Sequence, residues 1–322
     1  MARPGVRFPV LPLVHFGVWH GGWGALWQHE LHAERAGWMD FAALIIREGD
    51  RVSASGRLVR DGTGDWFEPP IPVAATGSLY RGIRPTWRGS VRIVGADFGA
   101  ELWDRFERDG VVEGHATLTG VWTAGRLRVE RQDLYAPQPP EIPDWTVPPC
   151  PPPTGGWPHQ SWVYDIKEVQ SGERPAAAYV GPVYDLGDLQ ESGAVVTVTT
   201  FRPSEDQAVL VVAAADPAAV EAHLRPQLGP LLCVVPSRWT RAELQAVRAH
   251  LHAHHEQWNL YAWGGCTSTE DGQARITASL TRILPEVATW ADSLPAGILG
   301  LTPWLIPARS DSRTISPGLM AR

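Results

Sequence analysis

The sequence APQPPEIPDWTVPPCPPPTGGWP, which runs from Ala136 to Pro158, divides the chain into two blocks. Ten of its 23 residues are proline. Proline fixes φ and lacks a backbone N–H donor, so neither a helix nor a central strand can run through this stretch. We expect an extended linker, and its Trp145 and Trp157 predict a strap that lies against one or both flanking blocks.

The two flanking blocks have the composition of a globular protein. The chain has 322 residues, of which 44% are hydrophobic and 20% charged, and this length predicts two domains. The net charge of −7 lies entirely in residues 136–322, which hold 19 acidic and 12 basic residues. Residues 1–135 hold 16 of each. Neither block therefore has the basic excess of a strongly basic nucleic-acid-binding protein.

The three cysteines predict no disulfide framework and no zinc site, because Cys150, Cys233 and Cys266 are few and widely spaced. The start of the chain has no clear signal-peptide cleavage site, and no run of about 18 apolar residues predicts a membrane span. The use of 27 arginines against one lysine is typical of a GC-rich bacterial genome. We therefore expect a cytoplasmic bacterial protein with reduced cysteines.

The first 48 residues are rich in tryptophan and histidine, and Trp19, Trp23 and Trp27 recur every four residues. We expect this segment to pack on the first domain, and an aromatic ligand site is the alternative.

The pattern of residues 49–135 predicts five strands and one helix. The strands are expected at residues 50–60, 65–70, 90–98, 111–122 and 125–132. The spacing of Leu102, Trp103 and Phe106 predicts a helix over residues 99–109. Three strands, a helix and two strands is the topology of the OB-fold, a five-stranded Greek-key barrel. A generic five-stranded barrel or a partial sandwich is the alternative.

An OB-fold suggests a surface for single-stranded nucleic acid or another anion, because such folds combine aromatic side chains with a basic groove. The candidate residues for this surface are Arg81, Arg84, Arg88, Arg92, Trp66 and Trp87. Arg126 and Arg128 share one face of the last expected strand. The alternative is that the aromatic residues, Phe67 and Trp122 included, fill the core while the arginines pair with nearby acids.

Residues 159–309 predict a layered α/β sandwich with the order ββαβαββ in one mixed sheet, with a ferredoxin-like variant as an alternative. Asp216 before Pro217 predicts the start of one helix, and Thr240 with Glu243 forms the capping box of another. A short helix is expected over residues 286–293. The polar residues 310–322 predict a disordered tail.

Three features of this second block are candidates for chemistry. The loops after two expected strands predict a ligand crevice formed by Asp216, Ser237, Arg238 and Thr240. His250 and His254 lie four residues apart and share a helix face, which makes them weak candidates for a metal site. Cys266, after two glycines, is a candidate nucleophile without a recognisable base.

No catalytic motif is present, so the sequence predicts no cofactor and favours a binding protein over an enzyme. We expect a non-enzymatic binding or scaffold protein that presents protein-interaction surfaces from two domains. Two alternatives stay open. One is single-stranded nucleic-acid binding through the first domain, and the other is an enzyme with a ligand or metal site in the second domain.

Overall fold

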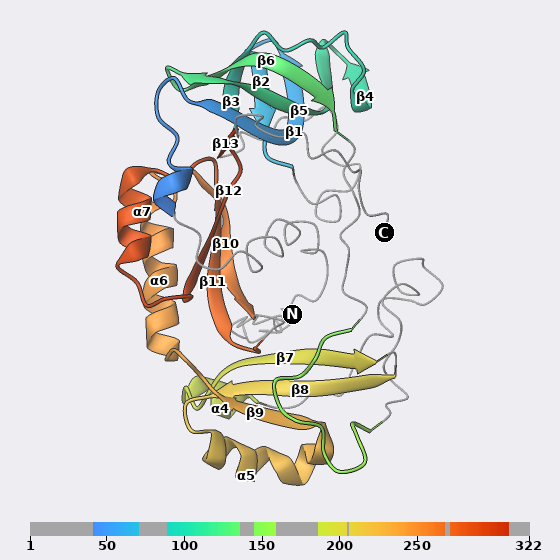
Figure 1. Ribbon diagram of the computed structural model, residues 1–322, viewed down its shortest axis with the longest axis vertical. Helices are drawn as coiled ribbons and strands as arrows, with labels where there is room; N and C mark the ends of the chain where they lie inside the picture. Colours follow the sequence, from blue (N-terminus) through green and yellow to red (C-terminus); the bar gives the residue numbers. More distant parts are fainter. Residues whose placement is uncertain are drawn as a thin grey trace, which may run out of the picture.

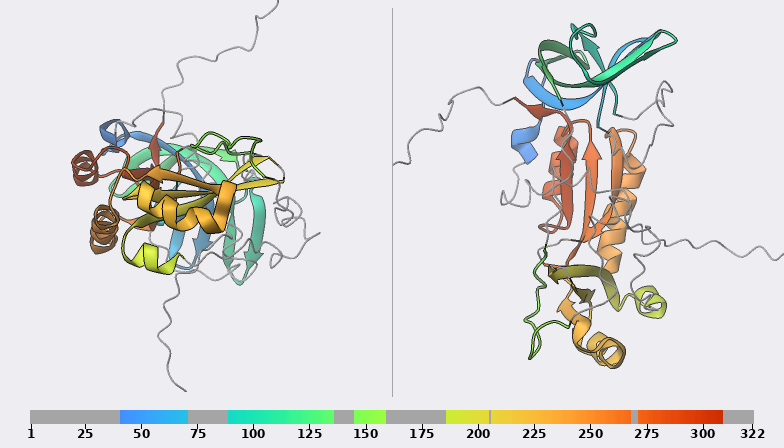
Figure 2. Two further views of the ribbon diagram at one scale, coloured as in Figure 1. Left: turned by 90° about the horizontal axis from the view of Figure 1, so that it is seen from below. Right: turned by 90° about the vertical axis from the view of Figure 1, so that its right-hand side faces the viewer.

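The computed structural model describes residues 41–70, 89–135, 145–158, 186–204, 206–267 and 271–308. These residues form a mixed α+β structure that consists mostly of strands in three sheets (Figure 1). The sheets follow one another along the long axis of the molecule, as the right-hand view of Figure 2 shows. The tryptophan- and histidine-rich residues 1–40 and the predicted tail lie outside the described residues.

The first sheet contains a closed ring of five strands, in which β5 pairs back with β1. The ring order is β1-β2-β3-β6-β5, and only the β3–β6 pair is parallel. Alternate residues of each strand point inward and form one core, with Leu58, Phe67 and Leu127 fully buried. The strands are β1 (Arg51–Asp61), β2 (Gly64–Glu68), β3 (Val91–Val94), β5 (Val111–Thr123) and β6 (Arg126–Leu134).

The helix expected over residues 99–109 is wrong, because this segment contains the strand β4 (Trp103–Arg108). β4 pairs with β5, whose residues 111–115 extend beyond the β5–β6 ladder. Leu102 is buried and packs against Gly114, where any Cβ atom would lie 2.6 Å from that of Leu102. The apolar spacing that predicts a helix thus comes from the buried Leu102 and from an edge strand. Pairing with β5 overrides the helical pattern of these residues.

The single mixed sheet expected for the second block, and with it the ferredoxin-like alternative, is replaced by two three-stranded sheets. Both have the same connectivity, an antiparallel hairpin followed by a helix and a parallel third strand. One consists of β7 (Val195–Ser204), β8 (Gln207–Ala214), α5 (Pro217–Leu228) and β9 (Leu232–Pro236). The other consists of β10 (Leu260–Thr267), β11 (Ala274–Leu280), α7 (Pro285–Asp292) and β12 (Leu299–Pro303).

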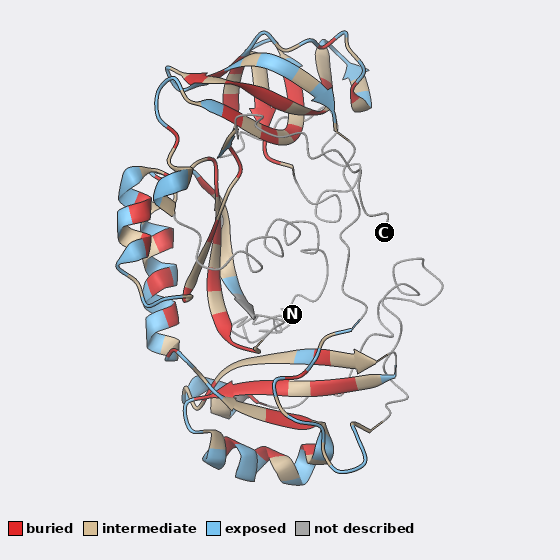
Figure 3. Ribbon diagram, viewed as in Figure 1, coloured by how far each residue is buried: buried red, intermediate tan, exposed pale blue. Residues whose placement is uncertain are grey.

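α6 (Arg241–His254) connects β9 to β10. β10 belongs to the sheet β10–β12, which lies between the other two sheets and is called the middle sheet below. α6 and α7 bury their apolar sides against β10–β12, whereas α5 buries its apolar side against β7–β9 (Figure 3). The predicted capping box of Thr240 and Glu243 at the start of α6 is confirmed, as is the cap that Asp216 provides for α5. Gln273 connects the layers, since its side chain bonds the backbone of Arg238 and Pro236.

Three shorter elements complete the described structure. The short strand β13 (Ile306–Pro307) returns the end of the chain to the ring, where it pairs with β1. The 3-10 helix η1 (Phe41–Leu44) packs against the core under α7, and α4 (Gly187–Glu191) precedes β7.

The described part of the proline-rich stretch, residues 145–158, lies along the β7–β9 sheet. The backbone N–H of Thr146 donates to the carbonyl of Arg202 at 2.7 Å, and the Gln207 side chain donates to the carbonyl of Trp157 at 2.7 Å. Cys150 forms a disulfide bond with Cys233 on β9, which corrects the expectation that the cysteines are reduced thiols. The two cysteines are 83 residues apart, so only the folded chain brings them together.

Candidate functional site

The most distinctive surface of the ring is an aromatic residue stacked with an arginine on neighbouring strands. Trp66 on β2 lies directly opposite Arg92 on β3, and the Arg92 guanidinium lies 3.8 Å from the centre of the Trp66 ring. Phe67, Val91 and Ile93 point into the ring core, so Trp66 and Arg92 belong to the outer face. A guanidinium at this distance makes a cation–π contact that fixes both side chains.

The turn between β1 and β2 holds this pair in place. The Trp66 indole donates to the hydroxyl of Thr63 at 3.1 Å, and Arg92 Nη1 donates to the Thr63 carbonyl. Gly64 has a φ of +133°, and a Cβ atom there would lie 1.9 Å from Arg92 Nη1. Gly64 is therefore required twice, for its backbone conformation and for the space that the guanidinium occupies.

Two further arginines continue the same face across β6. Arg126 lies opposite Arg92 in the parallel β3–β6 pair, and Arg128 lies opposite Val94, which is 52% exposed. We define the arginine face as Trp66, Arg92, Arg126 and Arg128. Arg126 is exposed and makes no ion pair with any residue that the structure describes.

The arginine face carries a net positive charge. Glu130 pairs with Arg128 at 3.9 Å and with Arg51 of β1 at 3.3 Å. Within the described residues no ion pair balances Arg92 or Arg126, although the ring segment as a whole is close to neutral. The face can therefore attract an anion and offer it flat contact surfaces.

The structure describes two of the six residues predicted for this surface. Trp66 and Arg92 lie together on the outer face, whereas Arg81, Arg84, Arg88 and Trp87 lie outside the described residues. The alternative of a core role holds for Phe67 and Trp122, which are buried in the ring. Sequence reasoning missed Thr63 and Gly64, and the turn sequence DGTGD was the only signal for them.

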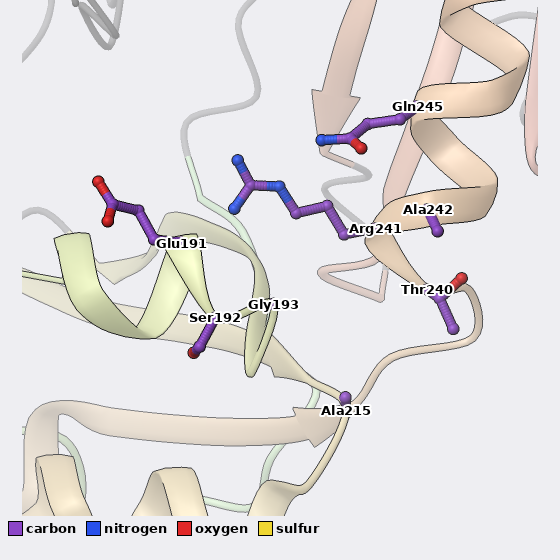
Figure 4. Close-up of a pocket in the computed structure, with 8 residues that line it drawn as sticks. All are labelled: Glu191, Ser192, Gly193, Ala215, Thr240, Arg241, Ala242 and Gln245. Atoms are coloured by element: carbon purple, nitrogen blue, oxygen red, sulfur yellow. The ribbon is translucent and has the colours of Figure 1, made fainter.

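Near the crevice predicted for the second block, an open groove of about 450 Å³ lies between α4 and the start of α6 (Figure 4). Only Thr240 of the four predicted residues lines it. Arg241 extends across the groove toward Glu191, as Figure 4 shows. Its guanidinium donates a hydrogen bond to the Gln190 carbonyl. The groove is thus bridged by a contact between α4 and α6.

The other three crevice residues have structural partners. The Asp216 carboxylate accepts a hydrogen bond from the Ala219 N–H at 3.1 Å, and the Ser237 hydroxyl donates to the Trp239 carbonyl at 2.7 Å. Arg238 forms an ion pair with Asp271 at 3.2 Å. These contacts explain the three side chains without a ligand.

The histidines at the end of α6 stack on aromatic rings. The rings of His250 and His254 lie 4.2 Å apart and face each other, and His250 also stacks on Trp290 at 4.4 Å. Burial, together with the neighbouring His254, lowers the pKa of His250. Parallel rings in contact do not direct their nitrogens at one ion, and no group of three metal-ligand side chains occurs among the described residues.

Cys266 lies on β10, opposite Arg275 of β11 in the backbone pairing. Its side chain lies outside the described part of the structure. No helix in the described parts of the chain is long and apolar enough to cross a membrane.

Comparison with known proteins finds no match for this chain, whether to a family model, to a curated protein or to a solved structure.

Proposed function

We propose that the ring is an OB-like barrel and that its arginine face binds single-stranded nucleic acid without catalysing a reaction. The proposal keeps the expected non-enzymatic binding role and makes nucleic acid, not protein, the ligand. The observation that carries it is the half-buried Trp66–Arg92 pair, held at 3.8 Å beside the exposed Arg126 and Arg128.

The strand order supports the OB-like assignment. Five strands close through β1 and β5, and the third strand of the ring pairs in parallel with the last one. In OB-folds the face of the second and third strands binds oligonucleotides, and here those strands carry Trp66 and Arg92. β4 occupies the place of the helix that commonly joins the third and fourth strands. A fold does not establish a ligand, so the side chains of the face must carry the argument.

The side chains of the arginine face suit a chain that alternates charge with flat rings. A base can stack on the Arg92 guanidinium plane or on exposed parts of Trp66, while Arg126 and Arg128 contact phosphates. Val94, between these arginines, offers an apolar contact for a base or sugar. Because each residue comes from a rigid strand, binding requires little reordering of the protein.

The test is fluorescence anisotropy with a labelled single-stranded oligonucleotide at two salt concentrations. We expect binding that weakens steeply with salt, and a double variant Arg126→Ala/Arg128→Ala that binds at least tenfold more weakly with a salt slope reduced by about 1 to 2. An abasic oligonucleotide of equal length separates base stacking from charge. It should bind more weakly than the normal strand, and Trp66→Leu should remove most of that difference.

The matched control is Arg105→Ala/Arg108→Ala, which removes two exposed arginines from β4 and changes the net charge of the protein equally. It should leave binding nearly unchanged. Absence of binding at low salt, or an equal loss in the control, refutes the proposal. Equal binding of the abasic strand refutes the stacking role and leaves a general anion surface.

A further inference from the structure

We propose that the Cys150–Cys233 disulfide is a structural clamp, formed in an oxidising compartment, that holds residues 145–158 over an apolar face of the β7–β9 sheet. This inference replaces the expected cytoplasmic location of the protein. It concerns the opposite end of the molecule from the arginine face (Figure 1) and holds whether or not the ring binds nucleic acid.

The clamped segment covers part of one apolar face of the β7–β9 sheet. α5 covers one side of the β7–β9 sheet, and the other side presents Phe201, Val209 and Val211, all 1% exposed or less. Cys150 and Trp157 of the segment pack against this second side. A parallel β-α-β unit needs cover on both faces. The segment shares this second face with Gly272 of the turn between β10 and β11, whose Cβ position lies 2.6 Å from Val211.

Hydrogen bonds alone hold the segment at only a few points. Thr146 exchanges two hydrogen bonds with the backbone of Arg202, at 2.7 and 2.6 Å, and Trp157 accepts one from Gln207. Trp145 and Val147, at 48% and 81% exposure, contribute little burial. A proline-rich chain has few backbone donors with which to form a ladder, so a covalent bond compensates for contacts that the sequence cannot make.

The surroundings of the two sulfurs favour a permanent bond over a reversible one. Cys233 is 1% exposed within the apolar cluster, while Cys150 is partly exposed. Of the two residues, only Cys150 has exposed surface from which a reducing thiolate can approach, and an attack on its sulfur would expel a Cys233 thiolate into apolar surroundings, where a charge is poorly solvated. The folded protein should thus resist reduction.

Formation of the bond needs an oxidant of the protein thiol–disulfide class. One cysteine thiolate attacks the oxidant's disulfide and forms a mixed disulfide, and the second thiolate then displaces the oxidant's sulfur. Two thiols lose two protons and two electrons, and the oxidant leaves as a dithiol. Such bonds persist in oxidising compartments and are rare in a reducing cytoplasm.

The first test traps the thiols of the full-length protein in its own cells with acid and an alkylating reagent, followed by mass spectrometry. The expected result is a single alkylated cysteine, Cys266, with Cys150 and Cys233 linked. Three alkylated cysteines in the cellular protein would overturn the proposal.

The second test measures thermal unfolding and limited proteolysis of the oxidised protein. Cys150→Ser, Cys233→Ser and the double variant should each lower Tm by on the order of 10 °C. Each should also make residues 145–158 the first site of cleavage. Cys266→Ser is the matched control and should melt like the parent.

If the Cys150 and Cys233 variants melt and resist protease like the control, the clamp role is wrong. If these variants do not fold, thermal unfolding of the oxidised parent with and without dithiothreitol replaces them, because the reagent reaches the bond once the chain opens; an unchanged Tm would overturn the clamp role. Loss of the bond within minutes without unfolding would contradict the predicted resistance to reduction.

Discussion

The indole Nε1 of Trp304 donates a 2.8 Å hydrogen bond to the backbone carbonyl of Ser55, 249 residues earlier in the chain. Trp304 follows β12 directly, and its ring lies 4.7 Å from that of Phe67 in the ring core. Gly56 permits this approach, because a Cβ atom there would lie 3.0 Å from the indole and 2.2 Å from the Glu68 carbonyl. Together with the pairing of β13 with β1, this contact joins the middle sheet β10–β12 to the ring.

Trp304→Ala should therefore destabilise the protein by about 3–5 kcal/mol, as expected for the loss of a buried aromatic side chain. Chemical denaturation followed by circular dichroism measures the effect. Trp145→Ala is the control, because this tryptophan is 48% exposed and its loss should cost below about 1 kcal/mol. Equal effects of the two substitutions would show that Trp304 does not join the layers.

Gly64→Ala should disrupt the arginine face while leaving the ring folded. The new methyl group would collide with Arg92 Nη1 at 1.9 Å and must displace the guanidinium from Trp66. We expect oligonucleotide affinity to fall by about tenfold, with a loss of stability of about 1 kcal/mol from the strained φ. Gly62→Ala in the same turn is the control, since nothing lies within 4 Å of its Cβ position. If Gly64→Ala leaves the oligonucleotide affinity unchanged, the Trp66–Arg92 pair does not contribute to binding.

Arg57 connects two buried carboxylates on the outer side of the ring. Its guanidinium contacts Glu68 of β2 at 3.3 Å and also contacts Glu113 of β5. Arg57→Leu should cost about 3–5 kcal/mol, because it leaves buried negative charge without this partner. Adding Glu113→Gln should restore part of the loss, and a double-mutant cycle measures the coupling. Arg60→Leu, which breaks a more exposed pair with Asp65, should cost no more than about 1 kcal/mol.

His115 should make the ring sensitive to acid. Burial and the neighbouring Arg57 lower the pKa of His115, whose ring also packs edge-on against Trp103 at 5.2 Å. The unfolded chain takes up the proton near pH 6.5, above the folded pKa. Stability is therefore complete above about pH 6.5 and falls as the pH drops through the folded pKa.

Urea denaturation of the parent and of His115→Gln at pH 7.5 and 5 checks this expectation. The difference between the two pH values should be smaller in the variant. His223→Gln on α5 is the exposed control and should keep the parent's pH dependence. A parent and variant with the same dependence would exclude His115 as the source.

Thr240→Ala should remove the capping box of α6. Hydrogen bonds from the backbone and hydroxyl of Thr240 lower the pKa of Glu243, so the capping interaction is present at neutral pH and is lost as the pH falls through that pKa. We expect a loss of about 1 kcal/mol at pH 7. Below pH 4 the difference between Thr240→Ala and the parent should shrink. Gln245→Ala, exposed on the same helix, should have little effect at either pH.

Local signals in the sequence located many of the described elements. Alternation placed the strands of the ring, and the caps at Asp216 and Thr240 placed the starts of α5 and α6. These features depend on neighbours in sequence, namely side-chain period, turn residues and the first orphan N–H groups of a helix. The helix expected at residues 99–109 was wrong because Trp103–Arg108 pairs with β5, which begins at Val111. Apolar spacing over so short a segment does not distinguish a helix from an edge strand.

The sequence by itself determined the strand periods, the helix caps and the interruption of regular structure at residues 145–158, which contain no helix or strand, because each is set within a few residues of backbone. Tertiary structure alone decided the partners: Trp66 with Arg92, Trp304 with Ser55, and Cys150 with Cys233. Each of these pairs joins residues 26 to 249 positions apart, and no local pattern states which strands will be neighbours. Pairing and packing of distant strands select those contacts, and with them the arginine face and the clamp.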